Sequence, residues 1–582
     1  TIEVDKKLAE LMGENKLDKD SQLTLPSFNV PEVPALHLHS EFSVYDSATT
    51  ANSWLHWASQ NGVSGVAFPD HTYATSLYNS INPAKAKDGS PKYPTVTTVP
   101  AISLWITNLD NKPYMLSAWA LSNKGYYNLV KLASIGWKTP ISIDKDIQAP
   151  SLTINQVSEY KEDVVFGTAC DKGLLSNLLD VSIDFDELKD SLFLLSNALG
   201  GLVLEYISLD IHKLFDSVSG FTAYRIPSAI KLQNRAKAIN NLIYRLVNDC
   251  GYSAIVSSIS HFIEESDKIV QDCKMKNSFK DERYFWESRH QRPAKEQFAI
   301  LCSHIEGFSI EDWNKSKKTA EEIVKNAKNI KIKHEYHLPK IAMPDNIKTK
   351  TADYDKQLYY LTMLKITEHG RWSNDPIYVA RFKKELDVIW KNKVMNFLPY
   401  FLVYEDISSH ARSKSILQGL ARGSAGGCLL SYYLKITHID PVARDLPFER
   451  FLSHARINAG SFPDIDADFS QRHQILAYLK EKYGVGFAQI GTFQKMKIKS
   501  AIKHAMYALY GRSGTDFEIK LLCDQIPDSP QGLDEFKFIY GYVDTEEVQH
   551  KGIIDTVPTL QTFFNQYPDC EDLVKKLTGL PA

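Results

Sequence analysis

The sequence has 582 residues, which is more than one hydrophobic core supports and predicts three or more domains. Hydrophobic residues make up 43% and charged residues 24%, no apolar run approaches the ~18–20 residues of a membrane span, and the first residues lack signal-peptide order. The net charge of −3 and seven scattered cysteines disfavour a wholly basic nucleic-acid binder, a disulfide framework and structural zinc. We therefore expect a cytoplasmic protein without membrane association, in which any DNA contact comes from a local basic surface.

The N-terminal half alternates predicted strands and helices. Residues 1–30 are polar and are predicted to be an N-terminal extension. Strands are then predicted at 36–39 and 65–69, a helix at 53–61, and further apolar stretches at 164–167 and 202–205. This alternation predicts an α/β domain over residues 31–275.

From residue 276 onward the pattern is mainly helical. Residues 280–345 are charged and include the Lys-rich run 315–333, which we interpret as a solvated helix face rather than a DNA contact. An amphipathic helix is predicted over 375–390, and an apolar segment at 400–406 leads to a glycine-rich loop. Beyond residue 490 the sequence again predicts helices.

The glycine-rich loop is Ala421-Arg422-Gly423-Ser424-Ala425-Gly426-Gly427. Its glycines allow backbone N–H groups to approach a phosphate closely, and Ser424 and Arg422 add further donors. Residues 428–435 are predicted to be helical, so that the helix N-terminus would add a partial positive charge. Taken alone, the loop is equally well explained as a flexible connection before a helix.

The segment Phe462-Pro463-Asp464-Ile465-Asp466-Ala467-Asp468-Phe469 follows about forty residues later. On a β-strand its three aspartates would point to one side, roughly 6.5–7 Å apart, where they repel one another unless solvent or divalent cations neutralise them. The pair Asp464 and Asp466 suits two Mg²⁺ ions, which prefer oxygen ligands. A lone Asp-x-Asp is most often a solvated turn, but after a Gly-Ser loop it predicts a metal-dependent nucleotidyl transferase.

A third motif is the stretch 483–515, which contains no acidic residue. It carries Lys495, Lys497, Lys499 and Lys503. On a helix the pairs 495/499 and 499/503 would share a face suited to a phosphate backbone. A solvated basic helix is the alternative.

Several motifs together resemble the C family of DNA polymerases, the bacterial replicative DNA polymerase III alpha subunits. Those of the palm are Arg422 to Gly427, Leu434-Lys435-Ile436-Thr437, Asp440-Pro441, Phe448-Glu449-Arg450-Phe451-Leu452 and Pro463 to Phe469, with Pro399-Tyr400-Phe401-Leu402 upstream and Gln489-Ile490-Gly491-Thr492-Phe493 downstream. Leu36-His37-Leu38-His39-Ser40, with Asp46 and Asp70-His71, resembles the polymerase-and-histidinol-phosphatase (PHP) domain of that family. The resemblance covers roughly residues 35–582 and, without an exonuclease insertion, is closest to the DnaE type.

The resemblance implies an α/β and α+β multidomain fold. It implies a PHP-type (β/α) barrel-like domain over 31–275, a polymerase-beta-like nucleotidyltransferase palm over 276–490 and a helical thumb over 491–582. Asp464 and Asp466 fall on the catalytic, Mg²⁺-binding carboxylates, and Asp468 on a flanking acid. Gly423 and Ser424, with Arg422 beside them, fall on the loop that contacts the phosphates of the incoming deoxynucleotide. The basic segment falls on the surface that grips primer–template DNA.

Two departures from the family pattern shape the expectation. The third palm aspartate of the family lies about 150 residues beyond the first pair, and this sequence ends at Ala582. We therefore expect an incomplete site, completed by a further segment or by a second polymerase chain that carries the fingers and reaches a sliding clamp. Both a natural split and a fragment, and both a bacterial nucleoid and a phage-infected host cytoplasm, stay open.

The second departure concerns the PHP metal ligands. Candidate ligands are His37, His39, Asp46, His71, Cys170 and His261, whereas Trp105, Tyr114 and Ile259 stand where the family has a Glu, a His and an Asp. We therefore expect a PHP domain that is structural or binds one metal weakly. A DNA-templated DNA polymerase is the favoured function, because Asp464 and Asp466 are intact. A PHP phosphoesterase or nuclease, and a silent DNA-binding replisome scaffold, are the alternatives.

Overall fold

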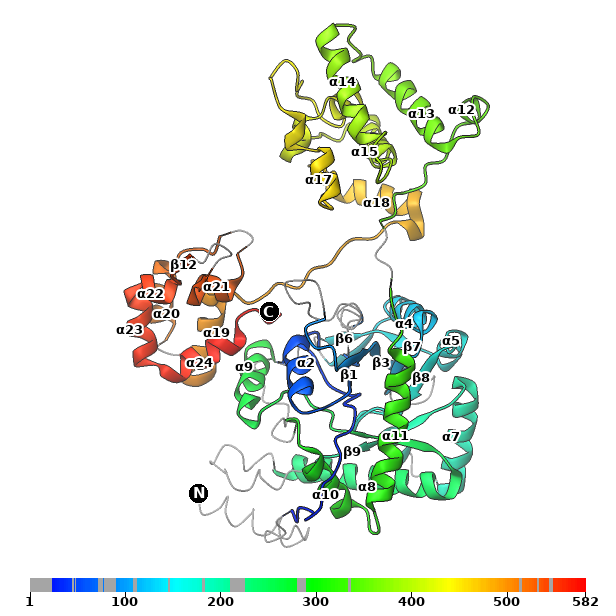
Figure 1. The fold of residues 1–582 in the computed structure, drawn as a ribbon, viewed down its shortest axis with the longest axis vertical. Helices are drawn as coiled ribbons and strands as arrows, with labels where there is room; N and C mark the ends of the chain where they lie inside the picture. The colour runs from blue at the N-terminus through cyan, green and yellow to red at the C-terminus, as the bar shows by residue number, and fades with distance from the viewer. Residues whose placement is uncertain are drawn as a thin grey trace. The chain divides into compact units, whose positions relative to one another are not determined.

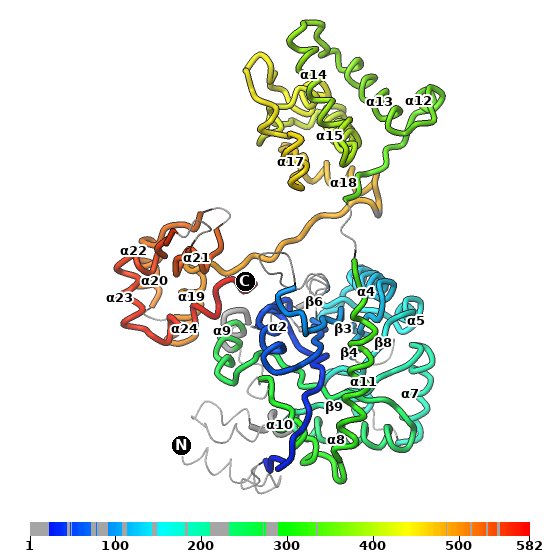
Figure 2. The backbone as a smooth tube through the Cα atoms, viewed as in Figure 1, coloured from blue at the N-terminus to red at the C-terminus, as the bar shows by residue number. Residues whose placement is uncertain are grey.

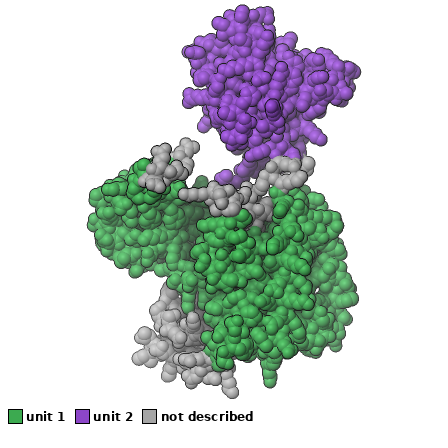
Figure 3. Space-filling model, in the orientation of Figure 1, with its two compact units in different colours: residues 1–332, 493–582 green, residues 333–492 purple. Residues whose placement is uncertain are grey.

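The computed structural model describes residues 23–43, 47, 49–71, 77, 91–107, 113–144, 147–180, 184–209, 226–279, 289–332, 336–511, 515–530, 533–543 and 548–581. The chain divides into two compact units, which are residues 1–332 with 493–582, and residues 333–492 (Figure 3). No helix in the described ranges is long and apolar enough to cross a membrane.

The first unit is built on a six-stranded mixed sheet (Figure 1). Its strand order is β10 (Ser253–Ser257), β9 (Val203–Ile207), β8 (Val164–Gly167), β4 (Tyr114–Ala120), β3 (Ala101–Ile106) and β7 (Ser151–Leu152). Strands β8, β9 and β10 run parallel, whereas β3 and β4 are antiparallel. Bridges from Leu38 to Ser260 and from Ala35 to Val66 connect residues 35–38 to the chain just after β10 and to the pair β1 (Gly65–Ala67) and β2 (Thr97–Val99). The expected α/β class is confirmed.

Helices pack against this sheet and against the β1–β2 pair, and their buried side chains form several hydrophobic clusters. The helices are α2 (Ala51–Gln60), α4 (Asn123–Gly136), α5 (Ile154–Glu159), α6 (Leu174–Asp180), α7 (Phe185–Leu199), α8 (Ile226–Cys250), α10 (Ala294–His304) and α11 (Ile310–Ala327). Helix α11, drawn in green in Figure 2, contacts β10 and β2, and its fully buried Trp313 donates a hydrogen bond to the carbonyl of Pro31 at 3.0 Å. Residues 289–332 therefore belong to this unit, whereas the sequence-based boundary at 275 falls inside α9 (Lys268–Phe279).

The C-terminal residues 493–582 form a small helical assembly that shares a core with α9. Its elements are α19 (Ile498–Tyr510), α20 (Asp516–Gln525), α21 (Glu535–Tyr540), β11 (Tyr542–Val543), β12 (Gln549–His550), α22 (Ile553–Thr556), α23 (Pro558–Gln566) and α24 (Pro568–Leu577). Val270 and Cys273 of α9 are buried in the same cluster as Ala501 of α19 and Leu573 of α24. An ion pair between Lys576 and Asp267 adds to this contact.

The second unit is helical. It contains α12 (Asp345–Lys348), α13 (Tyr354–His369), α14 (Pro376–Ile389), α15 (Leu398–Ser413), α16 (Leu429–Tyr433), α17 (His454–Asn458) and α18 (Arg472–Tyr483), with the 3-10 turns η4 (Gly423–Gly427), η5 (Phe448–Arg450) and η6 (Gly484–Gly486). Its core is rich in aromatic side chains, including Phe382, Phe401 and Tyr433.

Residues 464–468 do not form the predicted β-strand. Within 336–492 the backbone forms no strand ladder, and the segment makes one antiparallel bridge, between Gln418 and Phe469. Two local causes act against a ladder, because Pro463 has no N–H to donate and tyrosine hydroxyls hold both peptide groups of Ile465. The prediction of a strand at this position was wrong.

Candidate active site

The three aspartates are exposed around the buried Ile465. Ile465 is 2% exposed and packs in the core of the second unit, whereas its neighbours Asp464 and Asp466, and also Asp468, are exposed. An extended backbone turns successive side chains to opposite sides, so anchoring Ile465 directs the carboxylates outward. The carboxylates of Asp464 and Asp466 have no hydrogen-bond or ion-pair partner in the described part of the chain.

The glycine-rich loop lies directly beside this segment. Gly423 has a left-handed φ of +62°, and a Cβ placed on it would lie 2.6 Å from Oδ2 of Asp466. Gly419 donates its N–H to the backbone carbonyl of Asp468 at 3.1 Å. Two motifs that lie about forty residues apart in the sequence are therefore neighbours in the structure. They were linked at the sequence level only because both motifs occur in the same chain. Arg422 is exposed and Ser424 half-buried at this edge.

A buried carboxylate that the sequence analysis missed holds the rear of the loop. Glu385 of α14 is fully buried and accepts hydrogen bonds from the N–H groups of Leu429 at 2.9 Å and Leu430 at 3.0 Å. Arg381 donates to Glu385 at 2.8 Å and to the carbonyl of Gly427 at 2.7 Å. Burial raises the pKa of Glu385, although these hydrogen bonds and Arg381 act in the opposite direction. The sequence signal for this contact was the spacing of four residues between Arg381 and Glu385, which places both side chains on one face of a helix.

This contact corrects the role predicted for the following helix. The helix was expected over 428–435, with an N-terminus that would attract a phosphate. Instead α16 spans only Leu429–Tyr433, and Glu385 takes up its first two N–H groups. The negative charge of Glu385 already satisfies this helix end.

The exposed carboxylates fit the divalent cations that the sequence motif implies. Asp464 and Asp466 offer hard oxygen ligands from adjacent positions on one side of the chain, and no protein cation neutralises them within the described residues. Burial is the main cause that raises the pKa of Tyr404; Tyr400 acts in the opposite direction, and the charges of Asp464 and Asp466 raise this pKa further.

A histidine cluster occupies the first unit. Ligand atoms of His39, His71 and His261 lie within 4.8 Å of one another, and all three side chains are buried. The His39 ring lies 4.2 Å from each of the other two rings, centroid to centroid. Burial and the neighbouring histidines hold the pKa of His39 well below its usual range, which favours the neutral imidazole that a metal requires.

The other predicted PHP ligands do not complete this group. His37 donates or accepts at Nδ1 with Glu205 at 2.6 Å, and its buried Nε2 has no hydrogen-bond partner among the described residues. Burial raises the pKa of the Cys170 thiol to about 12, which disfavours a thiolate ligand. Asp46 lies outside the described residues. Trp105, Tyr114 and Ile259 are buried in the hydrophobic core.

Two buried carboxylates near these histidines were not among the predicted ligands. Glu205 also accepts the N–H of Ala169 at 2.8 Å. Asp70 accepts hydrogen bonds from the hydroxyls of Ser40 and Ser43, each at 2.7 Å, and its Oδ1 lies 4.0 Å from Nδ1 of His39. The protein's own hydrogen bonds thus satisfy the carboxylates of Glu205 and Asp70 within this cluster.

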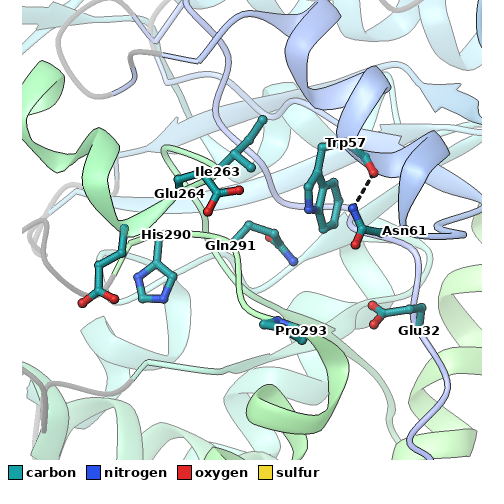
Figure 4. Close-up of a pocket in the computed structure, with 9 residues that line it drawn as sticks. Glu32, Trp57, Asn61, Ile263, Glu264, His290, Gln291 and Pro293 are labelled. Carbon is teal, nitrogen blue, oxygen red and sulfur yellow. Dashed lines mark hydrogen bonds between the residues drawn. The ribbon is translucent and has the colours of Figure 1, made fainter. Parts of the chain in front are cut away.

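The first unit also contains a cavity of about 330 Å³ (Figure 4). Glu32, Trp57, Ile263, Glu264 and His290 are among its lining residues, and none of the three cluster histidines lines it. Gln291, which also lines it, is held by the hydroxyls of Ser258 at 2.7 Å and Ser260 at 2.8 Å.

Only the second part of the predicted basic helix is helical in the structure. Helix α19 begins at Ile498, so Lys499 and Lys503 lie one turn apart on it, whereas Lys495 and Lys497 precede it and the predicted 495/499 helical pair does not form. The ammonium of Lys499 pairs with Asp528 at 2.9 Å. Lys495, Lys497 and Lys503 are exposed, and residues 494–500 line a cavity of about 270 Å³.

The comparisons match each of these regions to a known type of domain. The model of the bacterial DNA polymerase III alpha NTPase domain matches residues 356–581, and that of the PHP domain matches residues 35–208. The DNA polymerase III subunit alpha of Aquifex aeolicus is 27% identical over 566 residues, which cover 93% of this chain and 44% of the relative. That of Bacillus subtilis is 27% identical over 485 residues, which cover 80% of this chain and 38% of the relative.

A shorter and stronger match lies in DNA polymerase III subunit alpha of Mycoplasma genitalium, which is 47% identical over 133 residues, covering 22% of this chain and 14% of the relative. The chain spans less than half the length of these curated relatives. Its carboxylates, glycine-rich loop and lysines all fall within one matched range, and most of the histidine cluster falls within the other. Residues 35–208 are therefore similar to a PHP domain, and residues 356–581 are similar to the bacterial DNA polymerase III alpha NTPase domain.

Proposed function

We propose that this chain contributes the nucleotidyl-transfer site of a replicative, DNA-templated DNA polymerase. The observation that carries the proposal is the closeness of Gly423 to Asp466, because it sets the glycine-rich loop beside unpaired carboxylates. Under this proposal residues 333–492 act as the palm and residues 493–582 as the thumb. The polymerase III alpha relatives support this reading.

Each residue of the site has a separate task. Asp464 and Asp466 would hold the divalent cations, for which Mg²⁺ is the proposed ion. When bound, these cations lower the pKa of a primer 3′-hydroxyl and balance the charge of the triphosphate. Gly423 lets the loop backbone lie close to Asp466, Ser424 offers a hydroxyl donor, and Arg422 offers a guanidinium to phosphate oxygens. Asp468 is assigned no direct task.

We also propose that the site is completed by a third carboxylate outside the 582 residues, together with fingers that a further segment or a second chain supplies. Primer–template DNA and deoxynucleotides are the proposed substrates, and a sliding clamp is the proposed partner of the completing part. The late acids of residues 470–582 are the alternative source of the third carboxylate.

Primer extension with Mg²⁺ tests the proposal, with the chain alone and then with the polypeptide encoded next to it. Asp464→Ala or Asp466→Ala should abolish extension by the active assembly while leaving duplex binding nearly unchanged, whereas Asp468→Asn should extend at close to the wild-type rate. Extension by either alanine variant at the wild-type rate would exclude the metal assignment. Extension without a second chain would place the third acid within this one.

For the histidine cluster we propose binding of at most one transition-metal ion at His39, His71 and His261, without phosphoesterase activity. Its support is the closeness of three buried imidazoles. Elemental analysis of the purified chain and of His39→Gln tests the binding. Rapid metal-dependent hydrolysis of a phosphomonoester, lost in His39→Gln, would instead favour a PHP phosphoesterase.

A further inference from the structure

The peptide groups of Ile465, between the two proposed catalytic carboxylates, are held by two tyrosines of α15. We propose that Tyr400 and Tyr404 are positioning residues that fix the direction of Asp464 and Asp466. This inference rests on the proposed function of the two aspartates and assigns to α15 a role in that site.

Two tyrosine hydroxyls bond both polar groups of the Ile465 backbone. The Ile465 N–H donates to the Tyr400 hydroxyl at 2.9 Å, and the Tyr404 hydroxyl donates to the Ile465 carbonyl at 2.7 Å. The N–H and the carbonyl of Ile465 therefore each have a tyrosine partner.

These two hydrogen bonds hold the backbone of Ile465, which lies between the two carboxylates. Asp464 and Asp466 have no side-chain partners among the described residues, so their direction depends on the backbone between them. In a regular strand a ladder would supply this restraint, but none forms here. The two hydroxyls supply it instead, one turn apart on a helix whose residues Phe401 and Leu402 are buried.

The same geometry explains why two tyrosines are needed. Tyr400 and Tyr404 pack at a ring distance of 5.2 Å, and each is partly buried, so that its hydroxyl requires a protein partner. Burial is the main cause that raises the pKa of both phenols, and their protons therefore stay in place at neutral pH. Removing the Tyr400 hydroxyl leaves the Ile465 N–H without its hydrogen bond, and removing the Tyr404 hydroxyl leaves the Ile465 carbonyl without its hydrogen bond.

The test is Tyr404→Phe in the full chain, with Mn²⁺ affinity measured from the electron paramagnetic resonance signal of free Mn²⁺. A His39→Gln background removes any contribution of the histidine cluster. We expect an apparent Kd about fivefold weaker, which corresponds to the loss of one hydrogen bond of ~1 kcal/mol. Extension by the active assembly should need correspondingly more Mg²⁺, with an unchanged KM for deoxynucleotide.

Tyr378→Phe is the matched control, because the Tyr378 hydroxyl donates to Asp440 at 2.7 Å in the same unit. It should lower thermal stability to a similar extent without changing Mn²⁺ affinity. Equal losses of affinity in both variants, or wild-type affinity in Tyr404→Phe, would overturn the inference. Asp464→Asn tests the proposed metal binding separately from the role of the tyrosines. An unchanged Mn²⁺ affinity in that variant would overturn the proposed function itself.

Discussion

At the scale of single residues, the site depends on a glycine that two independent constraints require. Gly423 has a left-handed backbone, which costs a side chain roughly 1–2 kcal/mol, and its missing Cβ makes room for the Asp466 carboxylate. Gly460 has a similar φ of +79° but open space around it. The two glycines therefore separate backbone strain from steric collision.

We predict that Gly423→Ala lowers the rate of primer extension more than tenfold, because the new methyl group displaces Asp466. Gly460→Ala should cost only about 1 kcal/mol of stability, with extension unchanged. Circular dichroism melts and single-turnover extension measure the two effects. Equal extension rates in both variants would mean that the Gly423 contact does not matter for the reaction.

A buried carboxylate in the same unit predicts a pH dependence of stability. Burial alone would raise the pKa of Glu405, but hydrogen bonds from His369 and Ser409 and the charge of Lys365 outweigh it and lower this pKa. A lowered folded-state pKa stabilises the fold above the unfolded value of about 4.5, and this stabilisation is lost as the pH falls through the folded value.

Glu405→Gln should therefore destabilise the unit by about 1–3 kcal/mol at pH 7, with the difference shrinking below pH 4.5. Glu368→Gln, which removes an ion pair of a half-exposed side chain with Lys365, should cost at most about 1 kcal/mol. Urea unfolding at pH 7 and pH 4 decides between them. A Glu405→Gln deficit that is independent of pH would contradict the assigned charge effect.

At the scale of elements, α19 presents its lysines in a way that tests DNA contact. Lys503 is exposed, whereas Lys499, one turn earlier, is paired with Asp528. A duplex that binds this surface must compete with Asp528 for Lys499. Lys315 on α11 has an exposed ammonium and pairs with Asp312 at 3.4 Å, which makes it a comparable lysine outside the proposed DNA surface.

Charge reversal at Lys499 or Lys503 should weaken binding of primer–template DNA and reduce its log–log salt slope by about one unit for each lost phosphate contact. Lys315→Glu should leave the slope unchanged. Fluorescence anisotropy at several salt concentrations provides the measurement. A wild-type slope in both α19 variants would remove this helix from the DNA surface.

The elements also show what the sequence could predict. Local pattern was sufficient for the α/β unit, and the two motifs together were sufficient for the proximity of the glycine-rich loop to Asp466. Local pattern failed for the strand at 464–468, whose restraint comes from tyrosines sixty residues upstream, and for Glu385, whose role depends on a tertiary contact with α16. Side-chain to backbone contacts of this kind leave no periodic signal.

At the scale of the whole molecule, the two units differ in the number of sequence stretches that form them. Residues 333–492 are continuous and have their own aromatic core, whereas the first unit needs two separate stretches of sequence. Its C-terminal stretch covers Val270 and Cys273 of α9, and without that cover these side chains would meet water. At roughly 25 cal/mol per Å² of apolar surface, even a modest loss of burial amounts to several kcal/mol.

We therefore predict that the isolated fragment 336–492 folds, with a cooperative melt and dispersed amide signals, because its core residues all lie within it. The fragment 23–332 should instead unfold at a lower temperature than the first unit does in the full chain and should bind a hydrophobic dye through the uncovered face of α9. Adding 493–582 as a separate polypeptide should reverse both effects, since the missing cover returns as one piece. A fragment 23–332 that melts like the full chain would show that α9 needs no cover, and a fragment 336–492 without cooperative melting would show that its core depends on the rest of the protein.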